Sequence, residues 1–181
     1  MSIELIRKEV DAIKTEYNES DPFTLCRDLD ILVLKQPMGH SDDSCKGFFL
    51  TCDNIKSITV NCDLSPNMQR IIAAHELGHA ILHYDKSGLS TFHDFNLFDS
   101  ASIMEYEANI FAADLLISDE EVLEKLNADS SFFDAAALLK VPPELLDFKF
   151  RIMKREGYKI VEPPLLSNSN FLKNIKDENS Q

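Results

Sequence analysis

The sequence predicts a mainly helical α+β fold with a small β-sheet. Apolar residues recur at steps of three and four over much of the chain, which is the spacing of helices that bury one face. Glycine is scarce, with 5 residues in 181, and helix-forming residues are common. Two short β-prone runs between residues 47 and 62 supply the expected sheet. A hydrophobic content of 44% is enough for a single domain with a substantial core.

The N-terminal segment is expected to form two helices and a strand. The first helix is indicated by the apolar positions Ile3, Ile6, Val10, Ile13 and Tyr17. Ser20-Asp21-Pro22 combines a capping side chain with a proline in the first turn, so a second helix should run to about Leu29. Ile31 to Leu34 is a short apolar run that predicts a strand, and the polar stretch from Gln36 to Lys46 predicts a loop.

A β-hairpin should follow this loop. Gly47 to Cys52 and Ser57 to Cys62 are β-prone, and Asp53-Asn54-Ile55-Lys56 lies between them as the expected turn. Ser65-Pro66-Asn67 then gives the start signal of a helix.

The second half of the chain is expected to be helical. Tyr84 to Asp99 has no clear period and predicts a loop, after which a strongly apolar helix should span Ser100 to Ile117. Ser118 and Glu121 form a capping box at the start of a further helix. Two more helices are predicted near Ser131 to Leu139 and Pro142 to Arg155.

This order predicts three parts of unequal size. Residues 1–126 should form the main domain, residues 127–160 a helical extension packed on it, and residues 161–181 a disordered polar tail.

Composition restricts the possible partners and the compartment. A net charge of −13 argues against direct binding to nucleic acid or to an anionic membrane. No targeting segment or membrane-spanning apolar run is visible, and the cysteines Cys26, Cys45, Cys52 and Cys62 form no C-x-x-C pair. We therefore expect a cytoplasmic protein with reduced thiols.

The most informative stretch is His75-Glu76-Leu77-Gly78-His79, which reads H-E-x-x-H. Residues four apart on a helix share a face, so His75 and His79 can hold one Zn²⁺ ion. Zinc lowers the pKa of a bound water to about 7, and a glutamate beside it can act as general base. The pattern therefore predicts a zinc peptidase, with Glu76 as the catalytic residue. A catalytic zinc takes three protein ligands, so a carboxylate from a second helix is expected to complete the set.

A second motif lies about 26 residues beyond His79, in the run from Met104 to Leu116. It reads M-E-Y-E-A-N-I-F-A-A-D-L-L. Together with the H-E-L-G-H-A-I-L-H run from His75 to His83, it resembles the ImmA/IrrE family of metallopeptidases, over roughly residues 21–126. The order of a small sheet, an H-E-x-x-H helix and a second ligand-bearing helix is likewise similar to zincin catalytic domains.

The resemblance implies an intracellular zinc endopeptidase that cleaves a helix-turn-helix repressor encoded on a phage or mobile element. The negative charge of this chain suits such a basic partner. An alternative is a binding module of the same fold that sequesters a repressor or antitoxin with little turnover. The intact Glu76 favours the enzyme, because a binder needs no general base.

Two glutamates of the second motif compete as the third metal ligand. On a helix, Glu105 falls about 60° from the middle of the apolar face, and Glu107 about 100° away on the other side, near Asp114. Asn109 follows Glu105 by one turn, and this E-x-x-x-N spacing resembles the E-x-x-x-D of thermolysin-like zincins. We therefore expect Glu105 to bind the metal, Asn109 to support a metal-bound histidine, and Glu107 to be solvated.

Several other residues carry weaker signals. His83 is not expected to be a ligand, because it lies about 12 Å along the helix from His75. Tyr84, His93 and Tyr106 are the candidates for polarising the scissile carbonyl, although ordinary packing is the simpler reading of each. The two predicted C-terminal helices are expected to close the core or dock a partner rather than read DNA.

Overall fold

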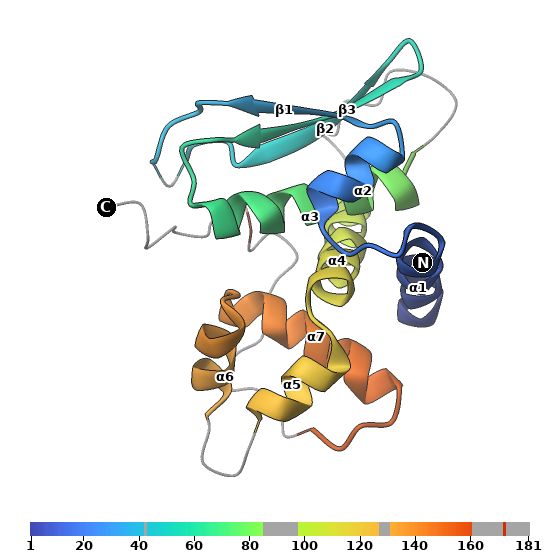
Figure 1. Cartoon of the computed structure of the whole chain (residues 1–181), viewed down its shortest axis with the longest axis vertical. Helices are drawn as coiled ribbons and strands as arrows, with labels where there is room; N and C mark the ends of the chain where they lie inside the picture. The colour runs from blue at the N-terminus through green and yellow to red at the C-terminus, as the bar shows by residue number, and fades with distance from the viewer. Residues whose placement is uncertain (42, 85–97, 127–130, 161–171, 173–181) are drawn as a thin grey trace.

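The computed structural model describes residues 1–41, 43–84, 98–126, 131–160 and 172 (Figure 1). These residues form seven helices and a three-stranded sheet, which confirms the predicted mainly helical α+β fold. The elements are α1 (Ile3–Tyr17), α2 (Pro22–Asp28), β1 (Leu32–Gln36), β2 (Gly47–Cys52), β3 (Ile55–Asn61), α3 (Pro66–Leu82), α4 (Phe98–Leu116), α5 (Asp119–Lys125), α6 (Phe132–Leu139) and α7 (Pro143–Arg155).

The sheet has the strand order β1-β3-β2, so both β1 and β2 are edge strands. β2 and β3 form the predicted hairpin and pair antiparallel, with Phe49 opposite Ile58. The turn is shorter than predicted, because Asp53 and Asn54 both adopt positive φ and close it with two residues. β3 therefore begins at Ile55 rather than at Ser57.

The first strand is shifted from the prediction and pairs parallel with β3. It spans Leu32–Gln36 instead of Ile31 to Leu34. Ile31 donates its backbone N–H to the carbonyl of Cys26, so this buried residue belongs to the C-terminal turn after α2.

α3 lies against β2 and β3 and begins where the sequence predicts, with Ser65 capping the backbone N–H of Met68. On its other side α3 crosses α4 at Gly78. A Cβ atom at Gly78 would lie 3.2 Å from Cα of Ala108 and 3.2 Å from Cβ of Phe111. The missing side chain therefore lets the two helices approach closely at the level of the H-E-x-x-H motif.

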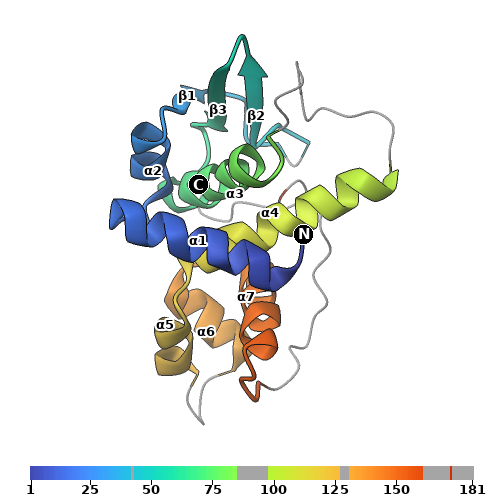
Figure 2. The same cartoon turned by 90° about the vertical axis from the view of Figure 1, so that its right-hand side faces the viewer.

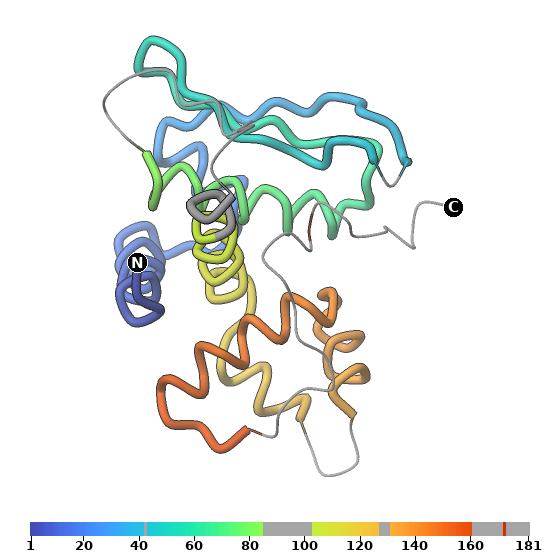
Figure 3. The backbone as a smooth tube through the Cα atoms, turned by 180° about the vertical axis from the view of Figure 1, so that it is seen from behind, coloured from blue at the N-terminus to red at the C-terminus, as the bar shows by residue number. Residues whose placement is uncertain are grey.

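α4 passes between α3 and the C-terminal helix α7, as the view from behind shows (Figure 3). α1 lies across α4 and also contacts α7 (Figure 2). Buried charges join these helices: Nζ of Lys149 lies 2.6 Å from Asp114 and 2.7 Å from Asp119, and Arg7 of α1 also pairs with Asp119. Ser118 and Glu121 form the predicted capping box of α5.

Two predictions fall largely outside the described residues. The predicted loop from Tyr84 to Asp99 is one, although α4 already begins at Phe98. The predicted disordered tail is another, and of its residues only Leu172 is described, where it is buried in the core. The division at residue 126 stays a prediction. Among the described residues, no helix combines the length and the apolar character needed to cross a membrane.

Candidate metal centre

Three side chains from two helices converge at one point. His75 and His79 lie one turn apart on α3, and their Nε2 atoms are 3.1 Å from each other. Glu105 of α4 reaches both, with Oε2 3.3 Å from Nε2 of His75 and Oε1 3.7 Å from Nε2 of His79. Both histidines are buried, and the Glu105 side chain is 12% exposed.

The spacing of these atoms fits a zinc ion. Nitrogen and oxygen ligands lie about 2.0–2.1 Å from zinc, so two ligand atoms of a tetrahedral site are about 3.3 Å apart. The three separations of 3.1, 3.3 and 3.7 Å bracket that value. Two imidazoles and one carboxylate are also a donor set that catalytic zinc uses, leaving a fourth position open.

Glu76 follows His75 on α3 and is 8% exposed. Its Cγ lies 3.7 Å from where a Cβ atom on Gly47 would stand, at the start of the edge strand β2. That Cβ would also come within 2.4 Å of Ile72, so only glycine allows β2 to pass this close to α3. The side chain of Glu76 therefore lies next to the start of β2, which is an edge strand of the sheet within the described residues.

The charges around His75 favour its protonated form in the metal-free chain. Burial lowers the pKa of His75, but the hydrogen bond with Glu105 and the negative charges of Glu76 and Glu105 outweigh it and raise the pKa. The fully buried Asn109 acts on the pKa of His75 in the same direction. Asn109 thus lies near a candidate ligand, and its role as a support of that ligand stays a prediction.

The burial of Glu107 differs from the prediction. This residue was predicted to be solvated, but it is buried, with a side-chain exposure of 7%. Its Oε2 lies 2.9 Å from Nε2 of His83, and its Oε1 pairs with the amino group of Met1. Glu107 is buried because the amino group of Met1 pairs with it and α1 packs on α4. Asp114 was also expected on the solvated side and is buried by its pair with Lys149.

Comparison with known proteins identifies the family. A family sequence model described as the IrrE N-terminal-like domain matches residues 26–151, which include both motifs. The chain belongs to the ImmA/IrrE family of metallopeptidases.

Two curated relatives agree with this assignment. The chain is 31% identical over 145 residues to the uncharacterized immunity region protein 2 of Bacillus phage phi105, covering 80% of this chain and 89% of the relative. It is 27% identical over 150 residues to the metallopeptidase ImmA of Bacillus subtilis strain 168, covering 80% and 83% respectively. The ImmA/IrrE resemblance stated from the motifs is thus confirmed.

The candidates for polarising a carbonyl are packing residues where the structure describes them. Tyr106 stacks edge-on against Phe148 at 5.6 Å, and Lys56 lies 4.1 Å above the ring of Tyr84. His93 lies outside the described residues.

Sequence reasoning did not anticipate the contact of His83 with His79. The Nδ1 atoms of these residues are 3.0 Å apart, on the side of His79 that faces away from the cluster. Burial lowers the pKa of His83 to about 4, and the positive charges of His75 and the N-terminus act in the same direction. In the sequence, His83 follows His79 by four residues, and this spacing could have indicated that their side chains meet on one face of the helix.

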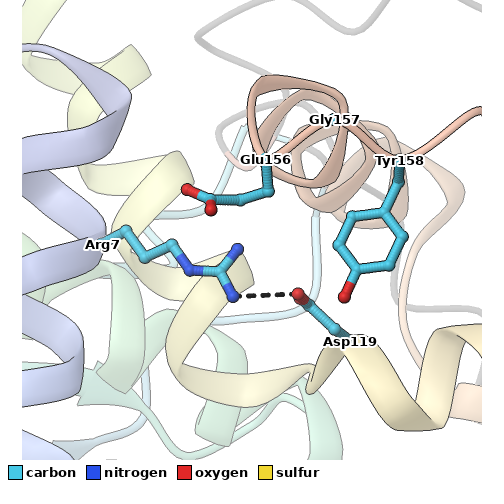
Figure 4. A pocket seen from close by; sticks show the side chains of 5 residues that line it. All are labelled: Arg7, Asp119, Glu156, Gly157 and Tyr158. Atoms are coloured by element: carbon cyan, nitrogen blue, oxygen red, sulfur yellow. Dashed lines mark hydrogen bonds and ion pairs between the residues drawn. The ribbon is translucent and has the colours of Figure 1, made fainter.

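A polar hollow elsewhere on this ImmA/IrrE chain shares no residue with the metal cluster. It measures about 280 Å³ and is lined by Arg7, Asp119, Glu156, Gly157 and Tyr158 (Figure 4). Arg7 and Asp119 are already paired across it, 2.9 Å apart, so the hollow borders the ion network that joins α1, α5 and α7.

Proposed function

We propose that this chain is a zinc-dependent endopeptidase that cleaves a cytoplasmic regulatory protein, specifically a helix-turn-helix repressor of a phage or mobile element. The observation that carries the proposal is the cluster of His75, His79 and Glu105, whose ligand atoms all lie within 4.8 Å of one another. Membership in a metallopeptidase family supports the same reading.

In the proposed reaction, different residues bind the metal and transfer the proton. His75, His79 and Glu105 would hold the ion, and Asn109 would keep His75 in place. A zinc ion bound there supplies a Lewis acid that activates water and polarises a peptide carbonyl. Glu76 takes a proton from the attacking water and delivers it to the departing amine, so its carboxylate is used twice in one turnover.

The outer edge of β2, in the part of the chain that the structure describes, offers a place for the substrate. β2 pairs with β3 on one side and is the outer strand of the sheet on the other. An extended peptide can add to such an edge through backbone hydrogen bonds. Because Gly47 brings the start of β2 next to Glu76, a peptide bound there would pass the general base. Cleavage of a flexible or locally unfolded segment follows from this geometry.

The net charge of the chain and its similarity to a phage protein both support a repressor as the substrate. The net charge of −13 complements a basic DNA-binding protein. The relative from phage phi105 is named for an immunity region. Sequestration of such a regulator without turnover is the weaker alternative, because it leaves the buried Glu76 beside the cluster without a use.

A substrate trap tests the proposal. Tagged Glu76→Gln chain is used as bait in a lysate of the native host, and each captured protein is then incubated with zinc-loaded wild-type chain. A captured helix-turn-helix regulator that wild type cuts is the expected result. Glu124→Gln, the same substitution at an exposed position, should cut it equally well. If the trap enriches only membrane or extracellular proteins, the proposed substrate class is wrong.

A further inference from the structure

We propose that His83 and Glu107 are positioning residues that hold the imidazole of His79 with Nε2 toward the metal cluster. The proposal rests on the proposed function, since it concerns how this chain prepares one metal ligand. Neither residue is one of the three whose ligand atoms converge. Each acts through the next, in the order Glu107, His83, His79.

The contacts form a continuous line from α4 back to α3. Oε2 of Glu107 lies 2.9 Å from Nε2 of His83. Nδ1 of His83 lies 3.0 Å from Nδ1 of His79, and Nε2 of His79 faces His75 and Glu105. His83 is the C-cap of α3, one turn beyond His79, so the helix itself sets the separation of the two rings.

Hydrogen-bond chemistry gives this line a direction. An ionised carboxylate only accepts, so Nε2 of His83 carries the proton that it donates to Glu107. Nδ1 of neutral His83 then has a lone pair and accepts the proton on Nδ1 of His79. With its proton on Nδ1, His79 presents the lone pair of Nε2 to the cluster, which is the form that binds a metal.

The hydrogen bonds of His83 and Glu107 are shielded from water. The side chains of His83 and Glu107 are 5% and 7% exposed, so water competes little for these hydrogen bonds. Oε1 of Glu107 is engaged by the amino group of Met1, which leaves Oε2 for His83. A histidine whose second nitrogen points to a carboxylate is a common support of metal ligands; here a second histidine stands between them.

The same contacts exclude His83 as a direct ligand. Both of its ring nitrogens face residues other than the cluster: one faces Glu107 and the other faces the back of His79. The described ligand atoms that converge belong to His75, His79 and Glu105.

Zinc affinity of matched variants tests the proposal. The dissociation constant for zinc is measured by competition with a chromophoric chelator, and the absorption spectrum of Co²⁺-loaded protein reports ligand geometry. Losing this kind of support costs about 10–100-fold in metal affinity. His83→Phe and Glu107→Leu should both show that loss and an altered Co²⁺ spectrum.

Conservative variants separate positioning from general destabilisation. Glu107→Gln keeps an oxygen that accepts from Nε2 of His83, and His83→Gln keeps an acceptor toward Nδ1 of His79. Both should lie closer to the wild-type dissociation constant than their apolar counterparts. Asp147→Leu removes a buried carboxylate of α7 that pairs with Arg151 and should leave zinc affinity unchanged. If His83→Phe does not fold, the two Glu107 variants carry the comparison.

The outcomes distinguish this proposal from the proposed function. Folded His83→Phe and Glu107→Leu with wild-type zinc affinity would overturn the positioning role while leaving the zinc site intact. Equal losses in Glu107→Gln and Glu107→Leu would also overturn it. Complete loss of zinc in His83→Gln with retention in Glu105→Ala would make His83 a ligand. A wild-type chain that binds no zinc would instead refute the proposed function.

Discussion

Oε2 of Glu105 lies 3.3 Å from Nε2 of His75, whereas Glu107, two positions along α4, faces His83 instead. The two carboxylates of the E-Y-E sequence therefore approach different histidines of α3. Glu105 lies beside both candidate ligands of α3, whereas Glu107 contacts a histidine behind one of them.

Zinc stoichiometry of two alanine variants separates these roles. Glu105→Ala removes one of the three proposed ligands, so we expect the variant to lose bound zinc at micromolar zinc concentrations. Glu107→Ala should retain one zinc per chain with weaker affinity, because all three ligands remain. Elemental analysis after gel filtration measures both. Full zinc in Glu105→Ala together with none in Glu107→Ala would reverse the assignment.

Gly78→Ala tests the close crossing of α3 and α4. The new methyl group would stand 3.2 Å from Cα of Ala108, and backbone atoms cannot yield as a side-chain end can. Alanine is favoured over glycine in a helix, which offsets part of the cost. We expect the free energy of unfolding in urea to fall by about 1–2 kcal/mol. Lys8→Ala on the exposed side of α1 should change it by less than about 0.5 kcal/mol. Unchanged stability in Gly78→Ala would contradict the described crossing.

Lys149→Met tests the buried ion pairs that Lys149 of α7 makes with Asp114 and Asp119. Lys149 is 2% exposed and pairs with both Asp114 and Asp119, so its removal leaves buried carboxylates without their cation. Breaking such a pair from one side costs about 3–5 kcal/mol. Urea unfolding should show that loss, and Lys149→Met combined with Asp114→Asn should recover part of it. If Lys149→Met alone were as stable as wild type, these ion pairs would contribute nothing to the free energy of unfolding.

Asp119 should make stability depend on pH in the acid range. Burial raises its pKa, but hydrogen bonds from Lys149 and Arg7 outweigh burial and hold the pKa below its ordinary value of 3.8. A carboxyl whose folded pKa is depressed stabilises the fold above its unfolded pKa, and this is lost as the pH falls through the folded pKa.

The stability advantage of wild type over Asp119→Asn should therefore be complete at pH 6 and shrink below about pH 3.8. Urea unfolding at pH 6 and pH 3 measures it. A difference that grows on acidification would contradict the depressed pKa.

Local signals predicted most elements near the site because local chemistry determines them. Ser65 and Pro66 mark the start of α3, and the spacing of His75 and His79 places both on one helical face. The same helical geometry predicts different sides of α4 for Glu105 and Glu107, which approach different histidines of α3. The hairpin was also predictable from two β-prone runs, although its two-residue turn was not.

Burial by distant segments was not predictable in this way. Helical angle showed that Glu107 points away from the middle of the apolar face, but not that the N-terminus would cover it, more than a hundred residues earlier in the chain. Asp114 was misjudged for the same reason, since its partner Lys149 comes from α7. The parallel pairing of β1 with β3 likewise depends on packing that no local run of residues reveals.

We propose that Glu76 acts as the general base of a zinc peptidase whose metal is held by His75, His79 and Glu105. The most direct measurement compares wild type with Glu76→Gln for zinc content and for cleavage of a captured regulator. Both proteins should contain one zinc, while the amide, which cannot take the proton from water, should cut more slowly by on the order of a hundredfold or more. Cleavage by Glu76→Gln at the wild-type rate, with equal zinc in both, would contradict the mechanism.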